Sequence, residues 1–197
     1  MSRKLAMSAM AAVVAGLFSV AASAQTAGSE VQRDVNQQQR IEQGLKSGSL
    51  TTREASQLER GESRIDRMES NALKDGKLSP AEKANIQRAQ NQESGAINRA
   101  EKNSQVGNPN SASSQRMQAD VQRNVNQQQR IEQGVKSGQL TNREVGKLER
   151  GQAKVNNKES RAGADGHVAA NEQKGIQKAE NKQSQRIRRE KHDAQKR

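Results

Sequence analysis

The sequence predicts an all-α protein built as a tandem duplication of a three-helix unit, and three observations support this prediction. A long stretch of the chain occurs twice at an offset of 90 residues. Signals for a helix start, of the form Ser/Thr-x-x-Glu, recur inside each copy. The segments between these signals are rich in Gln, Ala, Arg and Glu, which favour helices.

The duplication covers most of the chain. Residues 31–100 align with 121–190 with 37 identities in 70 positions. The most similar stretch is Val31–Arg40, which recurs as Val121–Arg130 with one change, from Asp to Asn. Between the copies the chain is rich in Ser, Asn and Gln, a composition typical of flexible linkers. We therefore expect helical repeats at 25–104 and 119–197, joined by a linker at 105–118.

Each copy contains a weaker internal repeat that marks where helices begin. Capping boxes are predicted for Thr51 with Glu54, Ser79 with Glu82, and Thr141 with Glu144. A glycine precedes each helix start, at positions 48, 76, 138 and 166, where a tight turn needs it. These signals predict helices over 30–45, 52–73 and 80–102, repeated 90 residues later. Gly61 and Gly151 fall inside the middle helices, and each weakens its helix by about 1 kcal/mol relative to Ala.

The first 24 residues have the features of a bacterial signal peptide. Arg3 and Lys4 precede an uncharged apolar stretch at 11–20, and Ala22-Ser23-Ala24 fits signal peptidase. The apolar stretch is shorter than the roughly 20 residues that span a membrane. We therefore expect cleavage near Ala24, a periplasmic or secreted mature protein, and no transmembrane segment in it.

The composition argues against an enzyme. The chain has no Cys, Trp or Tyr, and its single Phe is Phe18, so disulfides, thiolate chemistry and aromatic stacking on bases are excluded from the mature protein. No phosphate-binding glycine loop, zinc-ligand spacing or nucleophile elbow is present. We therefore predict a non-enzymatic protein that acts by interaction or as a structural component of the cell envelope, with self-association through its apolar stripes as an option.

The mature chain has few large apolar residues. Leu, Ile, Val and Phe make up about an eighth of it, a level usually linked to disorder. Little apolar burial is then available to offset chain entropy. We expect each helical unit to be marginally stable or partly disordered.

The loops resemble degenerate EF-hands. Helix, Asp-Gly-x-Leu-Ser-x-x-Glu and helix is similar to the second half of an EF-hand, with Asp75 at loop position 5 and Glu82 at position 12. Positions 1 and 3 depart from the pattern: they are Asn71 and Leu73 here, and every other loop also has an apolar or basic residue where a carboxylate is needed. The resemblance implies a weak divalent-cation site, with these candidate ligands: Asp75, Ser79, Glu82, Asp165 and Glu172. The alternative is that each Glu caps a helix and each Gly forms a turn. No other cofactor is expected.

A second resemblance covers more of the chain. The segments 40–44 (Arg-Ile-x-x-Gly) and 48–54 (Gly-x-Leu-Thr-x-x-Glu) and the terminal Lys191-His192-Asp193 resemble small exported helical repeat proteins of bacteria. This resemblance implies an architecture and not an activity.

Positive charge is concentrated in the second copy. Residues 31–104 contain 13 basic and 11 acidic residues, whereas residues 121–197 contain 18 and 9. Much of the excess is near the C-terminus, which predicts a polyanion-binding tail for an anionic envelope component or nucleic acid. Its candidate residues are Arg186, Arg188, Arg189, Lys191, Lys196 and Arg197. The alternative is a solvated helix end that keeps the protein soluble.

Overall fold

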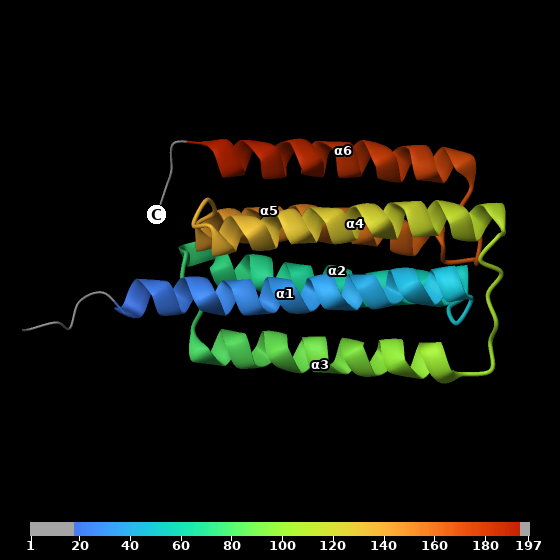
Figure 1. The fold of residues 1–197 in the computed structure, drawn as a ribbon, viewed down its shortest axis with the longest axis horizontal. Helices are drawn as coiled ribbons and strands as arrows, with labels where there is room; N and C mark the ends of the chain where they lie inside the picture. Colours follow the sequence, from blue (N-terminus) through green and yellow to red (C-terminus); the bar gives the residue numbers. More distant parts are fainter. Residues whose placement is uncertain (1–17, 194–197) are drawn as a thin grey trace, which may run out of the picture.

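The computed structural model describes residues 18–193, and the side chains of residues 27–193. This part of the chain folds into six long α-helices and one 3₁₀ turn (Figure 1). Their bounds are α1 Phe18–Ser47, α2 Thr52–Ala72, η1 Leu73–Asp75, α3 Pro80–Lys102, α4 Ala112–Lys136, α5 Asn142–Ala162 and α6 Ala170–His192. The described residues form no strand, so the prediction of an all-α protein is confirmed.

Helices α2, α3, α5 and α6 begin where the sequence signals predicted, whereas α1 and α4 begin 12 and 8 residues before the predicted starts at 30 and 120. Thr51, Ser79 and Thr141 each accept a hydrogen bond from the backbone amide three residues on, and the Glu at that position accepts one in return. Pro80 is the first residue of α3, where its missing N–H has no helical partner to lose. Gly48 and Gly76 have φ angles of 80° and 88°, in the left-handed region that favours glycine. Helix α6 differs, because Ala169 at its N-cap offers no side-chain acceptor.

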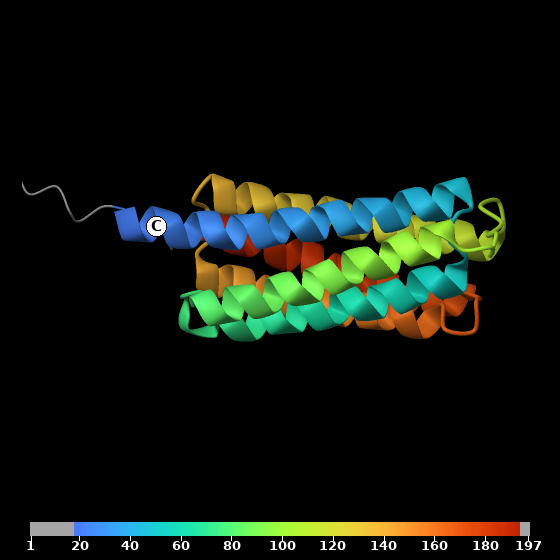
Figure 2. The ribbon, with the colours of Figure 1, turned by 90° about the horizontal axis from the view of Figure 1, so that it is seen from below.

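Helices α1, α2, α4 and α5 form the centre of the bundle, and α3 and α6 cover it on opposite sides (Figures 1 and 2). The most extensive contacts are those of α2 with α5 and of α1 with α4. Both pairs are antiparallel. Lys46 of α1 donates to Gln122 of α4, and Lys136 of α4 donates to Gln32 of α1. Likewise, Arg60 of α2 donates to Ser160 of α5, and Arg150 of α5 donates to Ser70 of α2. The central helices of each copy therefore pack mainly on those of the other.

The segment between α3 and α4 runs along one end of this bundle and is held there by hydrogen bonds. The N–H of Gly107 donates to the carbonyl of Gly48 over 2.8 Å, and Gln118 donates to the carbonyl of Pro109 over 2.9 Å. The sequence predicted a linker at 105–118 between two separate units. Each apolar cluster contains residues from both sides of this segment.

The apolar core is divided into two clusters near opposite ends of the bundle. One contains Ile41 and Leu45 from the C-terminal half of α1 with Met117 from the start of α4. The other contains Val31 from the first half of α1 with Ile131 from the last half of α4. Between the clusters, the residues that face inward are mostly Asp, Glu, Asn and Gln. The middle of the bundle is therefore a polar layer between two apolar ends.

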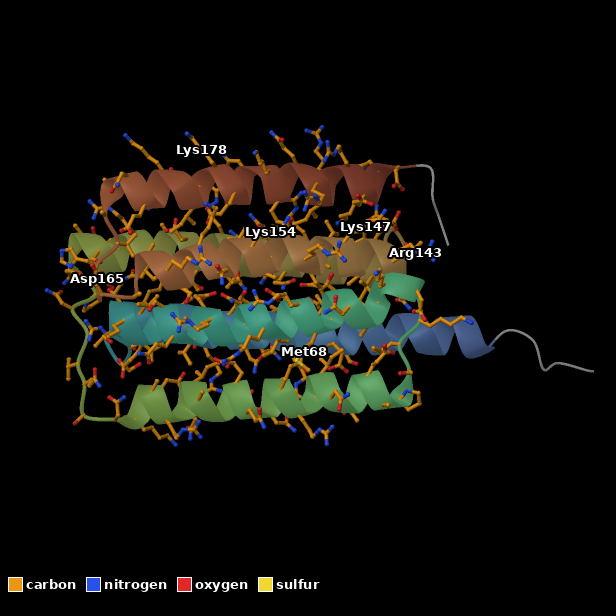
Figure 3. All side chains as sticks on the ribbon, turned by 180° about the vertical axis from the view of Figure 1, so that it is seen from behind. Met68, Arg143, Lys147, Lys154, Asp165 and Lys178 are labelled. Carbon is orange, nitrogen blue, oxygen red and sulfur yellow. The ribbon has the colours of Figure 1, made fainter. Side chains whose placement is uncertain are left out.

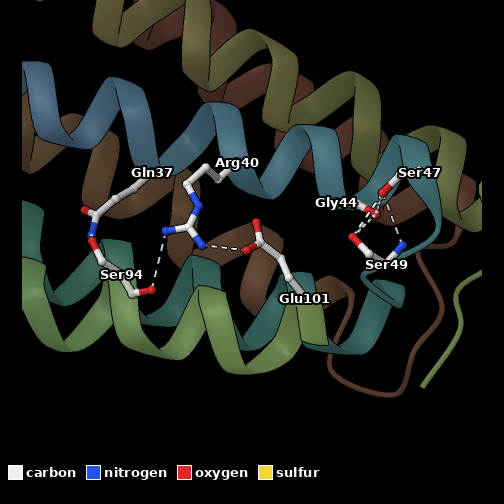
Figure 4. Close-up of polar contacts among 7 residues, drawn as sticks. All are labelled: Gln37, Arg40, Gly44, Ser47, Ser49, Ser94 and Glu101. Atoms are coloured by element: carbon white, nitrogen blue, oxygen red, sulfur yellow. Dashed lines mark hydrogen bonds and ion pairs between the residues drawn. The ribbon is translucent and has the colours of Figure 1, made fainter. Parts of the chain in front are cut away.

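Polar contacts also hold the outer helix α3 against α1 (Figure 4). Gln37 donates to the hydroxyl of Ser94 over 2.8 Å, and Arg40 pairs with Glu101 over 2.5 Å. At the end of α1 the hydroxyls of Ser47 and Ser49 both reach the carbonyl of Gly44. The contacts of Gln37 and Arg40 supplement the small number of apolar side chains on α3.

The two glycines inside the middle helices are sites of close approach. A Cβ added at Gly61 would overlap the carboxylate of Glu93, and one added at Gly151 would overlap the amide of Gln183. The sequence predicted only a weakened helix at these positions. In the structure, the missing side chain makes room for a polar group from α3 or α6 to reach the interior.

Candidate metal centre

The polar layer contains an unusual number of acidic side chains. Eleven carboxyl groups, here called the interior acidic cluster, are buried in the bundle and neither cap a helix nor pair with an adjacent Lys: Glu30, Asp34, Glu59, Glu62, Asp66, Glu69, Glu93, Asp120, Glu149, Glu159 and Glu180. Within the described residues, one of them has a basic partner within 4 Å, Glu180 with Arg123 at 3.0 Å. Buried carboxyl groups are normally paired with a positive charge, bound to a cation or protonated.

Four of these groups converge at one point, here called the four-carboxylate site. Asp34 comes from α1, Asp66 and Glu69 come from α2, and Glu149 comes from α5. One carboxylate oxygen of each residue lies within 4.8 Å of the corresponding oxygens of the others. Oxygen ligands on opposite sides of a Ca²⁺ ion, each about 2.4 Å away, are also about 4.8 Å apart. The spacing therefore suits one hard cation between the four groups.

Side-chain amides orient these carboxylates. Gln90 donates to Asp34 over 2.8 Å and to Glu69 over 3.2 Å. Asn156 donates to Asp66, and Gln128 donates to Glu149, each over 3.0 Å. The second oxygen of every one of the four carboxylates is buried and has no hydrogen-bond partner: Asp34 Oδ2, Asp66 Oδ1, Glu69 Oε2 and Glu149 Oε1. One oxygen fixed by an amide and the other free is the arrangement that outer-sphere hydrogen bonds give to metal ligands.

Helix periodicity explains how α2 supplies so many of these groups. Glu59, Glu62, Asp66 and Glu69 are spaced by three, four and three residues, so they lie on one face of α2. The same face carries Leu58 and Ile65, which are also buried. The acidic residues therefore occupy positions that in an ordinary bundle would be apolar.

Burial favours the protonated form of these groups when no cation is present. It raises the pKa of Asp34 to about 7 and that of Glu149 to about 8. Burial also raises the pKa values of Asp66 and Glu69 well above their usual range, and neighbouring carboxylates raise them further. A bound cation has to displace these protons, so affinity at this site increases with pH.

The loop residues predicted as cation ligands lie elsewhere, at turns and helix starts. Asp75 accepts from the N–H of Lys77, and Asp165 accepts from the N–H of His167, both over 2.8 Å. Ser79 and Glu82 bond to each other in their capping box, and Glu172 accepts from the N–H of Ala169 over 2.9 Å. Each of these groups already has a local partner, and none belongs to the four-carboxylate site.

The structure describes most of the basic residues that were predicted as a polyanion site. Arg186 lies beside a groove of about 480 Å³ between α5 and α6, whereas Arg188 and Arg189 line a different hollow with His192. The pKa of Lys191 is lowered by partial burial and by nearby Arg130. Lys196 and Arg197 lie outside the described residues.

The groove between α5 and α6 gathers more positive charge than the sequence suggested. Five basic side chains line it: Lys154, Lys158, Lys178, Lys182 and Arg186. Figure 3 shows Lys154 on α5 and Lys178 on α6. Sequence reasoning followed the run of charges at the C-terminus and missed this set, because its members come from two helices.

A second acidic group lies near the end of α6. Carboxylate oxygens of Glu144, Glu190 and Asp193 lie within 4.8 Å of one another, and Glu144 is buried while the other two are half-buried. Lys147 lies 3.8 Å from Glu190, and Glu144 also caps α5. This group is smaller and closer to solvent than the four-carboxylate site.

Sequence reasoning did not identify the interior acidic cluster, because its candidate sites were the loops and the basic tail. Two features of the sequence point to this cluster. Acidic residues are regularly spaced on the same helix face as apolar residues, and Asp34 corresponds to Asn124 in a segment that is otherwise repeated without change.

Among the described helices, none has a stretch apolar and long enough to cross a bilayer. Comparisons of the chain with known protein families, with curated proteins and with solved structures found no match.

Proposed function

We propose that this protein is an exported, non-enzymatic helical protein that binds a hard multivalent cation inside its bundle. One observation carries the proposal: four buried carboxylates from three helices meet within 4.8 Å, each with one oxygen that has no partner. Leaving four carboxylates uncompensated in a buried site costs several kcal/mol per ion. A bound cation removes that cost.

The ligand chemistry indicates the class of ion. The site offers carboxylate oxygens with no nitrogen or sulfur ligand, and such sets suit Ca²⁺, Mn²⁺ or trivalent ions of similar size. Four carboxylates carry a formal charge of −4, which favours ions of high charge. The site belongs to the bundle interior, so the proposal differs from weak binding at the EF-hand-like loops.

Export and duplication are part of the proposal. The signal-peptide features at 1–24 support export to the periplasm or the exterior, and cleavage near Ala24 would leave Ala27 and Val31 of the core in place. The 90-residue repeat and the shared capping boxes support descent from a duplicated three-helix unit with EF-hand-like loops.

The test is calorimetric titration of the mature protein with Ca²⁺, Mn²⁺ and Tb³⁺. We expect binding that is lost in the variant Glu69→Gln/Glu149→Gln, which keeps side-chain size and removes two charges. The matched control is Glu82→Gln/Glu172→Gln, which neutralises two loop carboxylates. Binding that survives the interior substitutions and disappears with the loop substitutions would instead support the EF-hand-like loops.

A second function, polyanion binding, is favoured by the five basic side chains along the α5–α6 groove. Phosphate-rich molecules suit such a surface because binding releases counterions. Arg188 and Arg189 extend the positive charge beyond the groove. Binding of lipopolysaccharide and of duplex DNA at low and physiological salt separates an envelope component from nucleic acid. Truncating the chain is a poor test, because Ile187 on α6 is completely buried.

A further inference from the structure

We infer that the bundle holds a second interior cation site, related to the first by the 90-residue repeat but carrying fewer charges. It consists of Glu59 on α2, Asn124 on α4, and Asn156 and Glu159 on α5, and is here called the carboxylate–amide site. The inference rests on the proposed function, because it extends cation binding to a second place in the same polar layer.

The repeat places each of these residues in correspondence with a ligand of the first site. Adding 90 to Asp34, Asp66 and Glu69 gives Asn124, Asn156 and Glu159, and subtracting 90 from Glu149 gives Glu59. Hydrogen bonds repeat in the same way: Gln38 donates to Glu59 over 3.1 Å, as Gln128 donates to Glu149 over 3.0 Å. The two sets of four therefore have matching surroundings in the two copies.

The carboxylate–amide site also has one unpartnered buried oxygen on each of its four residues. These atoms are Glu59 Oε1, Asn124 Oδ1, Asn156 Oδ1 and Glu159 Oε1, on side chains that are at most 1 % exposed. As at the first site, the other polar atoms are engaged, since Asn124 donates to Glu159 over 2.7 Å and Asn156 donates to Asp66 over 3.0 Å. Amide and carboxylate oxygens are both ligands for Ca²⁺-type ions.

Charge in the surrounding shell gives an independent reason for a second ion. In place of Gln90, which donates into the first site, the corresponding residue beside the second is the acid Glu180. The carboxylates of Glu59, Glu180 and Asp120 lie close enough to Glu159 to repel its charge. Arg123 lies 3.0 Å from Glu180 and compensates one of these charges. One ion at the four-carboxylate site would leave the remaining negative charges around Glu159 uncompensated.

The different ligand charges predict unequal sites. The first site has four carboxylates and the second has two, and the affinity of oxygen sites rises with the charge of their ligands. We therefore expect two ions to bind, the tighter at the four-carboxylate site and the weaker at the carboxylate–amide site. Trivalent ions should discriminate between the sites more strongly than Ca²⁺ does.

The experiment measures bound Tb³⁺ per chain by equilibrium dialysis of the mature protein. The variant Glu59→Gln/Glu159→Gln should bind one ion fewer than the wild type, losing the weaker ion, whereas Glu69→Gln/Glu149→Gln should lose the tighter one. An unchanged count in the first variant overturns this inference alone. An unchanged count in the second overturns the proposed function.

A gain-of-charge variant keeps the test independent of folding defects. Asn124→Asp should raise the affinity for the second ion by about tenfold and leave the first nearly unchanged, because it restores the residue found in the other copy. An unchanged second affinity in a variant with a wild-type circular dichroism spectrum contradicts the inference.

Discussion

The two copies of the repeat bury the same positions and fill them with different chemistry. Copy 1 supplies Asp34, Glu62 and Asp66 to the interior, where copy 2 has Asn124, Gln152 and Asn156. Outside, the five basic groove residues of copy 2 correspond to Arg64, Met68, Arg88, Gln92 and Ala96 in copy 1. Most caps and apolar positions are shared, so the comparison teaches that the fold depends on those and that charge has diverged around them.

The largest expected effect on stability comes from substitutions in the apolar clusters, and it should be the same in both copies. Ile41 and Ile131 are completely buried counterparts, one in each apolar cluster. Replacing either with Ala should lower the free energy of unfolding by about 2–5 kcal/mol, because it leaves a cavity. Chemical denaturation followed by circular dichroism measures this.

If Ala prevents folding, Ile41→Val and Ile131→Val give a milder pair, at about 0.5–1.5 kcal/mol each. If the losses in the free energy of unfolding differ between the two variants by more than about 1 kcal/mol, the shared apolar positions do not stabilise both copies alike.

The pH dependence of stability should report on the buried carboxyl groups. Asp34 and Glu59 have pKa values raised by burial to about 7 and about 8, above the values of about 4 in the unfolded chain. The folded protein thus holds more protons between these limits, so its stability without added cations falls as pH rises from about 4 to about 8. Thermal melting at pH 5 and pH 8 measures this, and added Ca²⁺ or Tb³⁺ should reverse the loss at pH 8.

Exchanging one pair of corresponding residues between the copies sharpens the comparison of their buried charges. Glu62 is buried with no hydrogen-bond partner for either oxygen, and burial raises its pKa well above the usual range. Glu62→Gln, which copies Gln152, should raise the melting temperature at pH 8 and flatten the pH dependence. Gln152→Glu should have the opposite effect. A Glu62→Gln protein that melts lower at pH 8 would show that this carboxylate is not a net electrostatic cost.

The groove between α5 and α6 predicts a smaller difference between the copies, in a polyanion affinity that depends on salt. Lys178→Gln/Lys182→Gln should weaken binding of a phosphate-rich polyanion by about tenfold at low salt and reduce the salt slope by roughly two. The control in copy 1 is Arg88→Gln, with Gln92 already neutral, and it should change affinity far less. Equal effects in the two copies would argue against the groove as the binding surface.

The smallest effect concerns one helix cap. Ser79 accepts a hydrogen bond from Glu82 N–H at the start of α3, whereas its counterpart Ala169 has no acceptor for α6. Ser79→Ala should cost about 1 kcal/mol, and Ala169→Ser should gain a similar amount. Urea unfolding at a fixed pH detects both changes. A gain at Ala169 without a loss at Ser79 would mean that the α3 start is held by packing instead.

The sequence by itself determined the local structure of this protein. Capping boxes at Thr51, Ser79 and Thr141, Pro80 at a first turn, and glycines before each cap act within a few residues, so their outcome could be read without knowing the fold. The all-α class followed from them. These interactions are local, and the energies that decide them depend little on distant parts of the chain.

Only the tertiary structure decided which helices meet, and with them the candidate site. Asp34 and Glu149 are far apart in sequence and belong to different copies, yet they converge because α2 packs on α5 and α1 on α4. The 3.6-residue period shows that Glu62 and Asp66 share a helix face, but not whether that face meets water or another helix. A carboxylate has the same local preference in both places. Its burial is set by the partner surface, and no local signal specifies that surface.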